Sequence, residues 1–168
     1  MTCQFAPRSA ALGLAAAALA GSSLAHAAAA APYRNTIGND LSRCSGSGPA
    51  VKVDISGIAP VKGKVRIQLY RGTAADWLEK GRWLNRIEVP ATGGSMTLCM
   101  PVPGAGTYGI AVRHDVNGNG ATELRSDGGG MSNNPAINIF NLGKPSYKKA
   151  AFSVGNEVKS ISIQMKYM

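Results

Sequence analysis

The sequence has little of the chemistry from which most catalytic and metal centres are built. Its 168 residues include two histidines, three cysteines and nine acidic residues. No Ser-His-Asp or Cys-His arrangement can be recognised in it. The glycines at 128–130 are followed by neither a Lys-Ser/Thr pair nor a helix start, which excludes a phosphate-binding P-loop. These absences favour a binding or structural protein over an enzyme.

Long apolar runs are missing after the N-terminal segment, so we expect no transmembrane segment in the mature chain. The N-terminal segment has a basic residue, Arg8, an apolar run over residues 10–20, and the small-x-small tripeptide Ala25-His26-Ala27. The run is too short to cross a bilayer, and the arrangement is typical of a secretory signal peptide over residues 1–27. Cleavage after Ala29 or Ala31 is the alternative. The mature protein is expected to be periplasmic or secreted.

The sequence has so few cysteines that only one disulfide is expected in the mature chain. Cys3 belongs to the expected signal peptide, which leaves Cys44 and Cys99. In an oxidising compartment such a pair most simply forms one disulfide, and two buried free thiols are the alternative. The bond would close a loop of about 55 residues and stabilise the fold by about 4 kcal/mol in the chain-entropy model. Neither cysteine has the spacing of a zinc ligand.

Acidic residues are outnumbered, with 18 lysines and arginines against nine aspartates and glutamates, a net charge of +9. A charge of this size attracts anionic surfaces, glycans and acidic polymers. The cations are spread along the chain, so a basic surface that is merely solvated is the alternative. Expected export argues against a nucleic-acid partner.

Short runs of alternating apolar and polar residues dominate the chain after position 50. Val51, Val53 and Ile55 alternate with polar neighbours, and Lys64–Tyr70 does the same, which is the period of a half-buried strand. Residues 28–49 lack this period and are predicted to be a flexible leader. Further strands are predicted over residues 83–89, 95–100, 107–113, 150–154 and 160–167.

One short helix is expected among these strands. Thr73 and Asp76 have the spacing of a capping box, which predicts a helix over Ala74–Lys80. With about seven strands, Pro/Gly turns and no βαβ alternation, the pattern predicts an all-β fold, an antiparallel β-sandwich over residues 50–168.

The segment richest in functional groups is the loop His114–Asn134. It contains the pattern D-x-N-x-N-G, in which oxygens at every second position face one turn and the glycine permits the bend. The candidate calcium ligands are Asp115, Asn117, Asn119, the Ala121 carbonyl and Glu123, with Gly120 at the bend. The second half departs from the pattern, because Ser126 replaces the usual bidentate glutamate and Asp127 stands beside it.

Two interpretations of this loop remain open. A calcium site with so few carboxylates would bind weakly, with Kd about 0.1–1 mM. The Asn-Gly pairs and Asx side chains also build turns without metal. In either case the glycines at 128–130 are expected to fold the chain back, so that Ser132, Asn133 and Asn134 reach the Asp115 turn.

His114 stands at the start of this loop. Imidazole suits transition metals better than calcium. His114 could act as a general base beside Asp115, which would make the protein a metal-assisted hydrolase. The alternative is a histidine that is simply a hydrogen-bonded element of the loop.

The run GTYGIAVRHDVNGNG, followed by GGGMSNN and GKPSYKKAAFSV, resembles an uncharacterised family of exported bacterial proteins, the domain-of-unknown-function family 2141. The motif positions are His114, Asp115, Asn117, Asn119, Gly120, Ser132 and Asn133. The resemblance implies a secreted single β-sandwich, similar in outline to transthyretin-like or immunoglobulin-like modules, and it implies no activity. Glu123 stands where many members have an aspartate, and SDGGG replaces a Gly-x-Pro segment.

These observations together predict an exported binding or structural module of the bacterial cell envelope, with a loop shaped by calcium. Its partner would be an envelope protein, a glycan or an anionic surface. The metal-assisted hydrolase and a purely structural domain without a ligand are the alternatives.

Overall fold

The computed structural model describes residues 1–2, 32–123 and 125–168. Apart from its first two residues, the predicted signal peptide lies outside the described part of the chain. Among the described residues, no helix is both long enough and apolar enough to cross a membrane.

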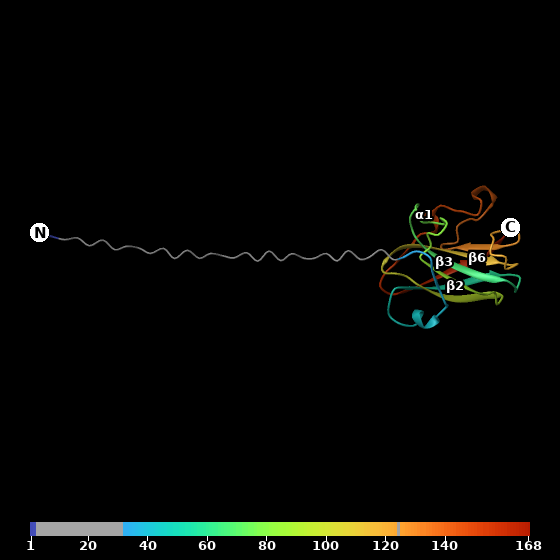
Figure 1. Ribbon diagram of the computed structural model, residues 1–168, viewed down its shortest axis with the longest axis horizontal. Coiled ribbons are helices and arrows are strands. Elements are labelled where there is room, and N and C mark those ends of the chain that lie inside the picture. The colour runs from blue at the N-terminus through green and yellow to red at the C-terminus, as the bar shows by residue number, and fades with distance from the viewer. Residues whose placement is uncertain (3–31, 124) are drawn as a thin grey trace.

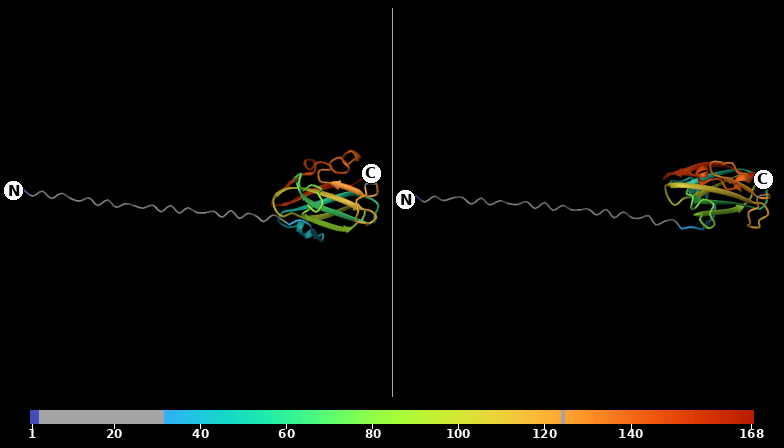
Figure 2. Two further views of the ribbon diagram at one scale, coloured as in Figure 1. Left: turned by 45° about the horizontal axis from the view of Figure 1, so that its top comes forward. Right: turned by 90° about the horizontal axis from the view of Figure 1, so that it is seen from above.

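Two β-sheets form the body, which confirms the prediction of an all-β sandwich (Figure 1 and Figure 2). In the larger sheet the order is β1-β4-β3-β6-β7-β10, and β8 pairs with the first residues of β6. These strands are β1 (Asn35–Ile37), β3 (Lys64–Arg71), β4 (Asn85–Pro90), β6 (Gly106–Asp115), β7 (Gly128–Met131), β8 (Phe152–Val154) and β10 (Lys166–Tyr167). The smaller sheet, in the order β5-β2-β9, contains β2 (Ala50–Ile58), β5 (Gly94–Pro101) and β9 (Val158–Gln164). The helical elements described are η1 (Leu41–Cys44), η2 (Ile139–Asn141) and α1 (Tyr147–Ala150).

The core lies between the two sheets and follows from the alternating pattern. Along β3, Val65, Ile67 and Leu69 are completely buried and face the smaller sheet, where Val51 and Val53 of β2 are equally buried. Burying one such aliphatic side chain stabilises the fold by roughly 1.5–3 kcal/mol relative to leaving it exposed. The alternate residues of β3 therefore form the outer face of the larger sheet.

Two strand pairings are parallel, whereas the sequence predicts an antiparallel sandwich. β9 runs parallel to β2, and β1 runs parallel to β4. Alternation determines which face of a strand is buried, but it carries no information about the direction of the neighbouring strand. The described residues form ten strands instead of about seven, because β1, β7 and β10 are too short or too rich in glycine to show a period.

The segment predicted as a flexible leader, residues 28–49, is tied to the body over its described part. β1 adds to the edge of the larger sheet, and the Cys44–Cys99 disulfide joins η1 to β5. The disulfide prediction is confirmed. Asn39 Oδ1 also accepts a hydrogen bond from the Cys99 backbone N–H at 2.9 Å.

The helix predicted over Ala74–Lys80 does not form, and this segment is a series of turns. Leu78 has a φ of 58°, which a right-handed helix does not allow. The Asp76 carboxylate does not cap a helix, because it accepts a hydrogen bond from Tyr33 Oη at 2.9 Å and pairs with Arg82 Nε at 3.1 Å. The short α-helix is α1, at the other end of the chain.

Trp77 covers part of the outer face of the larger sheet. Its indole lies over Gly109, where a Cβ would approach within 2.6 Å of the ring, and it packs edge-on against Tyr70 at 5.6 Å between centroids. Trp83, Met131 and Ala150 complete this second apolar cluster. The absence of a side chain at Gly109 thus leaves room for the Trp77 indole on this face. The part of the face beside Trp77 borders a groove, which is described below.

Candidate functional site

Strand β6 delivers His114 and Asp115 to opposite faces of the larger sheet. His114 has no exposed surface and lies between the sheets. Its Nε2 lies 2.7 Å from the Lys62 carbonyl, which can only accept, so Nε2 carries a proton. Its Nδ1 lies 2.7 Å from Tyr167 Oη, which itself accepts from the Ala59 N–H at 2.9 Å. His114 is a fully bonded core residue, and this geometry gives no support to a hydrolase built on His114 and Asp115.

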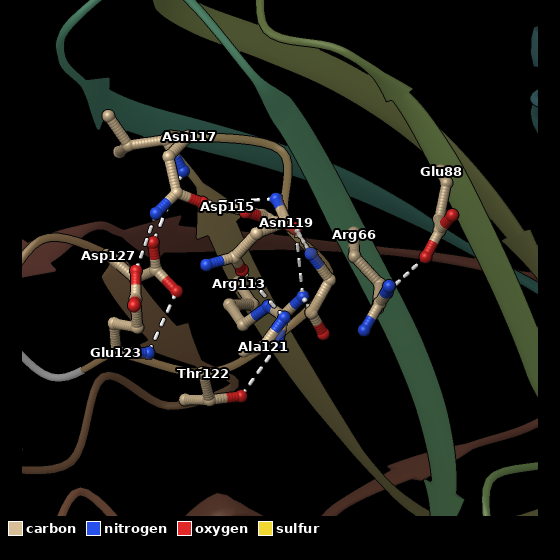
Figure 3. Close-up of polar contacts among 12 residues, drawn as sticks. Arg66, Glu88, Arg113, Asp115, Asn117, Asn119, Ala121, Thr122, Glu123 and Asp127 are labelled. Carbon is tan, nitrogen blue, oxygen red and sulfur yellow. Dashed lines mark hydrogen bonds and ion pairs between the residues drawn. The ribbon is translucent and has the colours of Figure 1, made fainter.

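The predicted loop residues on the other face converge on one tight turn (Figure 3). Asp115 Oδ2 accepts a hydrogen bond from the Gly120 N–H at 2.9 Å. Asn117 Oδ1 accepts from the Asn119 N–H at 3.0 Å, and Asn119 Oδ1 accepts from the Ala121 N–H at 2.8 Å. Each of these side chains closes a local turn, which is the usual role of Asx residues in loops.

Glu123 and Asp127 complete the loop from its far side (Figure 3). Asp127 accepts from the Val116 N–H at 3.2 Å with one oxygen and from the Glu123 N–H at 3.0 Å with the other. Glu123 Oε2 accepts from Asn117 Nδ2 at 2.6 Å and from Ser126 Oγ at 3.1 Å. The structure therefore brings both acidic residues to the Asp115 turn, as expected.

Ser132, Asn133 and Asn134 do not reach this turn, contrary to the prediction. The glycines at 128–130 form strand β7 and do not fold back, because Gly130 lies so close to β9 that a Cβ would meet Ile163 at 2.7 Å. Ser132 Oγ donates to a backbone carbonyl in α1 at 2.5 Å. Asn133 and Asn134 donate to carbonyls beside α1 and in β9. These three residues hold the sandwich together.

Arg113 supplies a positive charge inside the loop. Its Nη2 lies 3.2 Å from Asp115 Oδ2 and donates to the Gly120 carbonyl at 3.1 Å, while Nη1 donates to Thr122 Oγ1 at 2.6 Å. Burial by itself raises the pKa of Asp115, but hydrogen bonds from Gly120 and the charge of Arg113 outweigh it and lower the pKa. The loop carboxylate is therefore ionised and already has a cationic partner.

The residues of the loop fit calcium poorly in this arrangement. Calcium requires six to eight oxygen ligands. The side-chain oxygens of Asn117, Asn119 and Asp127 already accept N–H groups, and Arg113 lies against Asp115. Asp115 Oδ1, which is buried without a hydrogen-bond partner, is the exception. Over residues 32–123 and 125–168, no group of three or more His, Cys, Asp or Glu residues is placed to hold a metal ion.

The outer face beside this loop carries a row of charged residues that the sequence analysis missed. Strand pairing places Arg66 between Glu88 of β4 and Arg113 of β6, and it continues the row through Gly129 to Lys166. Arg66 forms an ion pair with Glu88 (Figure 3). The only signal in the sequence was that arginines occupy polar positions of three predicted strands, and the row appears only once these strands are paired.

The next row across the same strands contains Arg86, Gln68, Ala111 and Met131. The Arg86 guanidinium lies over the Trp83 ring, 4.1 Å from its centroid. Burial lowers the pKa of Arg86 below its usual value, and the neighbouring Arg66 lowers it further. The two rows together make a floor that contains four cations, with the apolar Ala111 and Met131 at one end of the second row.

A groove of about 480 Å³ lies over this floor, and all of the floor residues except Glu88 and Arg66 line it. Its walls are the turns around Leu78–Gly81, the loop residues Thr122, Glu123 and Asp127, and the segment from Ile137 to Lys144. Five cations line it, Lys80, Arg86, Arg113, Lys144 and Lys166, against three acids, Glu79, Glu123 and Asp127. Cations therefore outnumber acids in the lining, and Lys80, Arg86, Lys144 and Lys166 are the cations that lie outside the loop.

A comparison with known protein families matches the part of the chain that contains this loop and most of the groove floor. A family model described as "Uncharacterized protein conserved in bacteria (DUF2141)" matches residues 53–162. The protein belongs to this family. The match covers the loop and most of the groove floor, and it ends before Lys166. Neither a curated protein nor a solved structure matched this chain.

Proposed function

We propose that this member of the DUF2141 family is an exported binding module of the bacterial cell envelope. Its ligand is a small oxyanion, such as a carboxylate or a phosphate, carried on a sugar or another compact body. The observation that carries the proposal is the cationic groove on the outer face of the larger sheet, whose lining includes Arg86 and Arg113.

The size of the groove supports a small-molecule ligand. Its 480 Å³ falls within the roughly 300–1,000 Å³ of ordinary ligand sites. The apolar side of the floor, Ala111 and Met131, suits the body of a ligand, while Arg86 suits its charge. Guanidinium groups bind carboxylates and phosphates through paired hydrogen bonds.

The electrostatics of the floor support an anion. Like charges directly opposite each other on paired strands are destabilising, and Arg66 and Arg113 are such a pair. Each of these two has an acidic partner, Glu88 and Asp115 respectively. Among the described residues, Arg86 has no carboxylate within 4.0 Å. An anion bound at Arg86 would relieve the repulsion that the fold leaves in place.

The lining favours binding over catalysis. The described residues around the groove include no histidine, cysteine or serine. His114, the histidine that the sequence singled out, lies on the opposite face of the sheet and outside this lining. The described lining therefore lacks the residues for a serine or cysteine nucleophile activated by a histidine base.

Calorimetric titration tests the ligand class. We would titrate the protein with digalacturonate, its methyl ester, a hexose 6-phosphate and inorganic phosphate. The charged compounds are expected to bind, and the ester, which differs only in charge, at least tenfold more weakly. Arg86→Gln should reduce the affinity at least about tenfold, since one charge-assisted hydrogen bond contributes roughly 1.5–3 kcal/mol.

Arg43→Gln is the matched control, because Arg43 lies on η1, 62% exposed and away from the groove. Equal losses in the two variants would mean attraction by net charge alone. No binding of any of the charged compounds would overturn the ligand class.

Export is tested separately. We expect the chain to be recovered from the periplasm or the medium with an N-terminus at Ala28, or at a position after Ala29 or Ala31. Recovery of the uncleaved chain from the cytoplasm would contradict export without bearing on the groove.

A further inference from the structure

The segment from Ala136 to Lys144 forms a tip that projects from the body and presents large apolar side chains to solvent. It is the orange-red loop that rises above the sheets in Figure 1 and in the left view of Figure 2. Phe140 is 92% exposed and Leu142 is 70% exposed. Adjacent exposed side chains of this size mark an interaction site more often than isolated ones do.

The backbone of the tip is already hydrogen-bonded within itself. The N–H of Asn138 donates to Asn141 Oδ1 and the N–H of Asn141 donates to Asn138 Oδ1, both at 3.1 Å. Asn141 Nδ2 donates to the Ala136 carbonyl at 2.7 Å, and the Lys144 N–H donates to the Asn141 carbonyl at 2.7 Å. Because these groups are paired, moving the tip into a less polar medium leaves few of them without partners.

Only positive charges accompany the tip along the chain. Lys144 ends it, and Lys148 and Lys149 follow in α1, all three exposed. No acidic residue occurs between Asp127 and Glu157. An apolar projection with basic residues beside it suits an anionic lipid surface, where the apolar groups enter the interface and the lysines meet headgroups.

We propose that this tip docks the protein on membranes that contain anionic lipids, with Phe140 and Leu142 inserted at the headgroup–acyl boundary. This docking does not depend on the identity of the groove ligand. Because the tip is also one wall of the groove, docking by the tip would hold the groove beside the membrane surface.

Vesicle co-sedimentation tests the proposal. The mature protein, without the predicted signal peptide over residues 1–27, would be mixed with vesicles of phosphatidylcholine alone, or of phosphatidylcholine and phosphatidylglycerol in equal amounts. Three lysines near an anionic surface, at about fivefold each, predict binding to the mixed vesicles that is roughly 100-fold tighter. Phe140→Ser should weaken binding to the mixed vesicles about tenfold, as expected for partial loss of one apolar side chain from the interface.

Val61→Ser is the matched control, because Val61 is also an exposed apolar residue, at 67%, but lies in the turn after β2. It should bind like the wild type. Equal binding by Phe140→Ser and wild type would show adsorption by net charge and would overturn insertion, as would no binding to mixed vesicles.

A fluorescent variant checks insertion directly. Phe140→Trp should shift its emission to the blue on mixed vesicles and be quenched by brominated lipid, whereas Trp77 and Trp83, only 7% and 8% exposed, should respond little. An unchanged spectrum would overturn insertion. Self-association that requires Phe140 and occurs without lipid would assign the tip to a protein contact and likewise overturn the proposal.

Discussion

The Asp115 loop and the groove floor lie side by side on one face of the larger sheet, but their charged groups differ in the partners that the chain gives them. In the loop, Asp115 accepts hydrogen bonds from Gly120 and Arg113, and Asp127 accepts two backbone N–H groups. In the floor, Arg66 and Arg113 face each other across paired strands, and Arg86 stacks on an aromatic ring. The carboxylates of the loop thus have partners within the chain, whereas Arg86 in the floor has no carboxylate within 4.0 Å among the described residues.

This difference separates a residue's contribution to folding from its contribution to binding. A ligand can add free energy only where the chain has not already supplied a partner, because displacing an internal partner costs about as much as the new contact gains. The loop is dense in polar groups and attracted the prediction of a metal site. In the floor, Arg86 has no carboxylate within 4.0 Å among the described residues, which makes the floor the better place for an anionic ligand.

Asp115→Ala should have the largest effect on stability. The change leaves the Gly120 N–H without its acceptor and the half-buried Arg113 guanidinium without its carboxylate, which together cost about 3 kcal/mol. Urea denaturation would measure the loss. Asp115→Asn keeps an acceptor for Gly120 and should lose about half as much. A change below about 0.5 kcal/mol in both variants would show that the loop does not stabilise the fold.

Acid should act on the same carboxylate. The pKa of Asp115 is lowered in the folded protein. Its ionised form therefore contributes stability that is complete above the unfolded-state pKa of about 3.9 and is lost as the pH falls through the folded-state value. Urea unfolding from pH 7 to pH 2 would show this loss. Asp115→Asn should have a flatter profile at the acid end, and two parallel profiles would contradict the assignment.

Much of the framework could be predicted from the sequence, and the failures share a cause. Alternation revealed the strands around Val65 and Val112, and the scarcity of cysteine revealed the Cys44–Cys99 disulfide. The loop residues were recognised because their spacing is local. Strand direction, the arginine rows and the position of Ser132 depend on which strands become neighbours, and no local period encodes that.

The failed helix at Ala74–Lys80 illustrates the same limit. Its capping residue, Asp76, is used by Tyr33 and Arg82, which are distant or follow the segment in sequence. A local signal was thus overridden by tertiary partners.

Arg86→Gln should sharpen the contrast between the two regions with a small effect on stability. Removing one of several neighbouring cations from the floor lessens their repulsion, so the free energy of unfolding should stay within about 0.5 kcal/mol of the wild type or rise. Urea denaturation would be run beside the ligand titration. A loss of more than about 2 kcal/mol would mean that Arg86 stabilises the fold through its contact with Trp83. The loss of ligand binding in this variant would then result from destabilisation of the protein.

Calcium should have the smallest effect. A site with Kd near 1 mM would stabilise the protein by about 1 kcal/mol in 5 mM calcium. We expect the melting temperature in calcium to match that in magnesium and in chelator, because Arg113 already neutralises Asp115. Arg113→Gln is the informative variant: it removes the internal cation and should lower the melting temperature, while making it more responsive to calcium than the wild type. A calcium-specific rise of several degrees in the wild type would instead mean that the ion displaces Arg113, and the guanidinium released by that exchange would then add to the cationic floor of the groove.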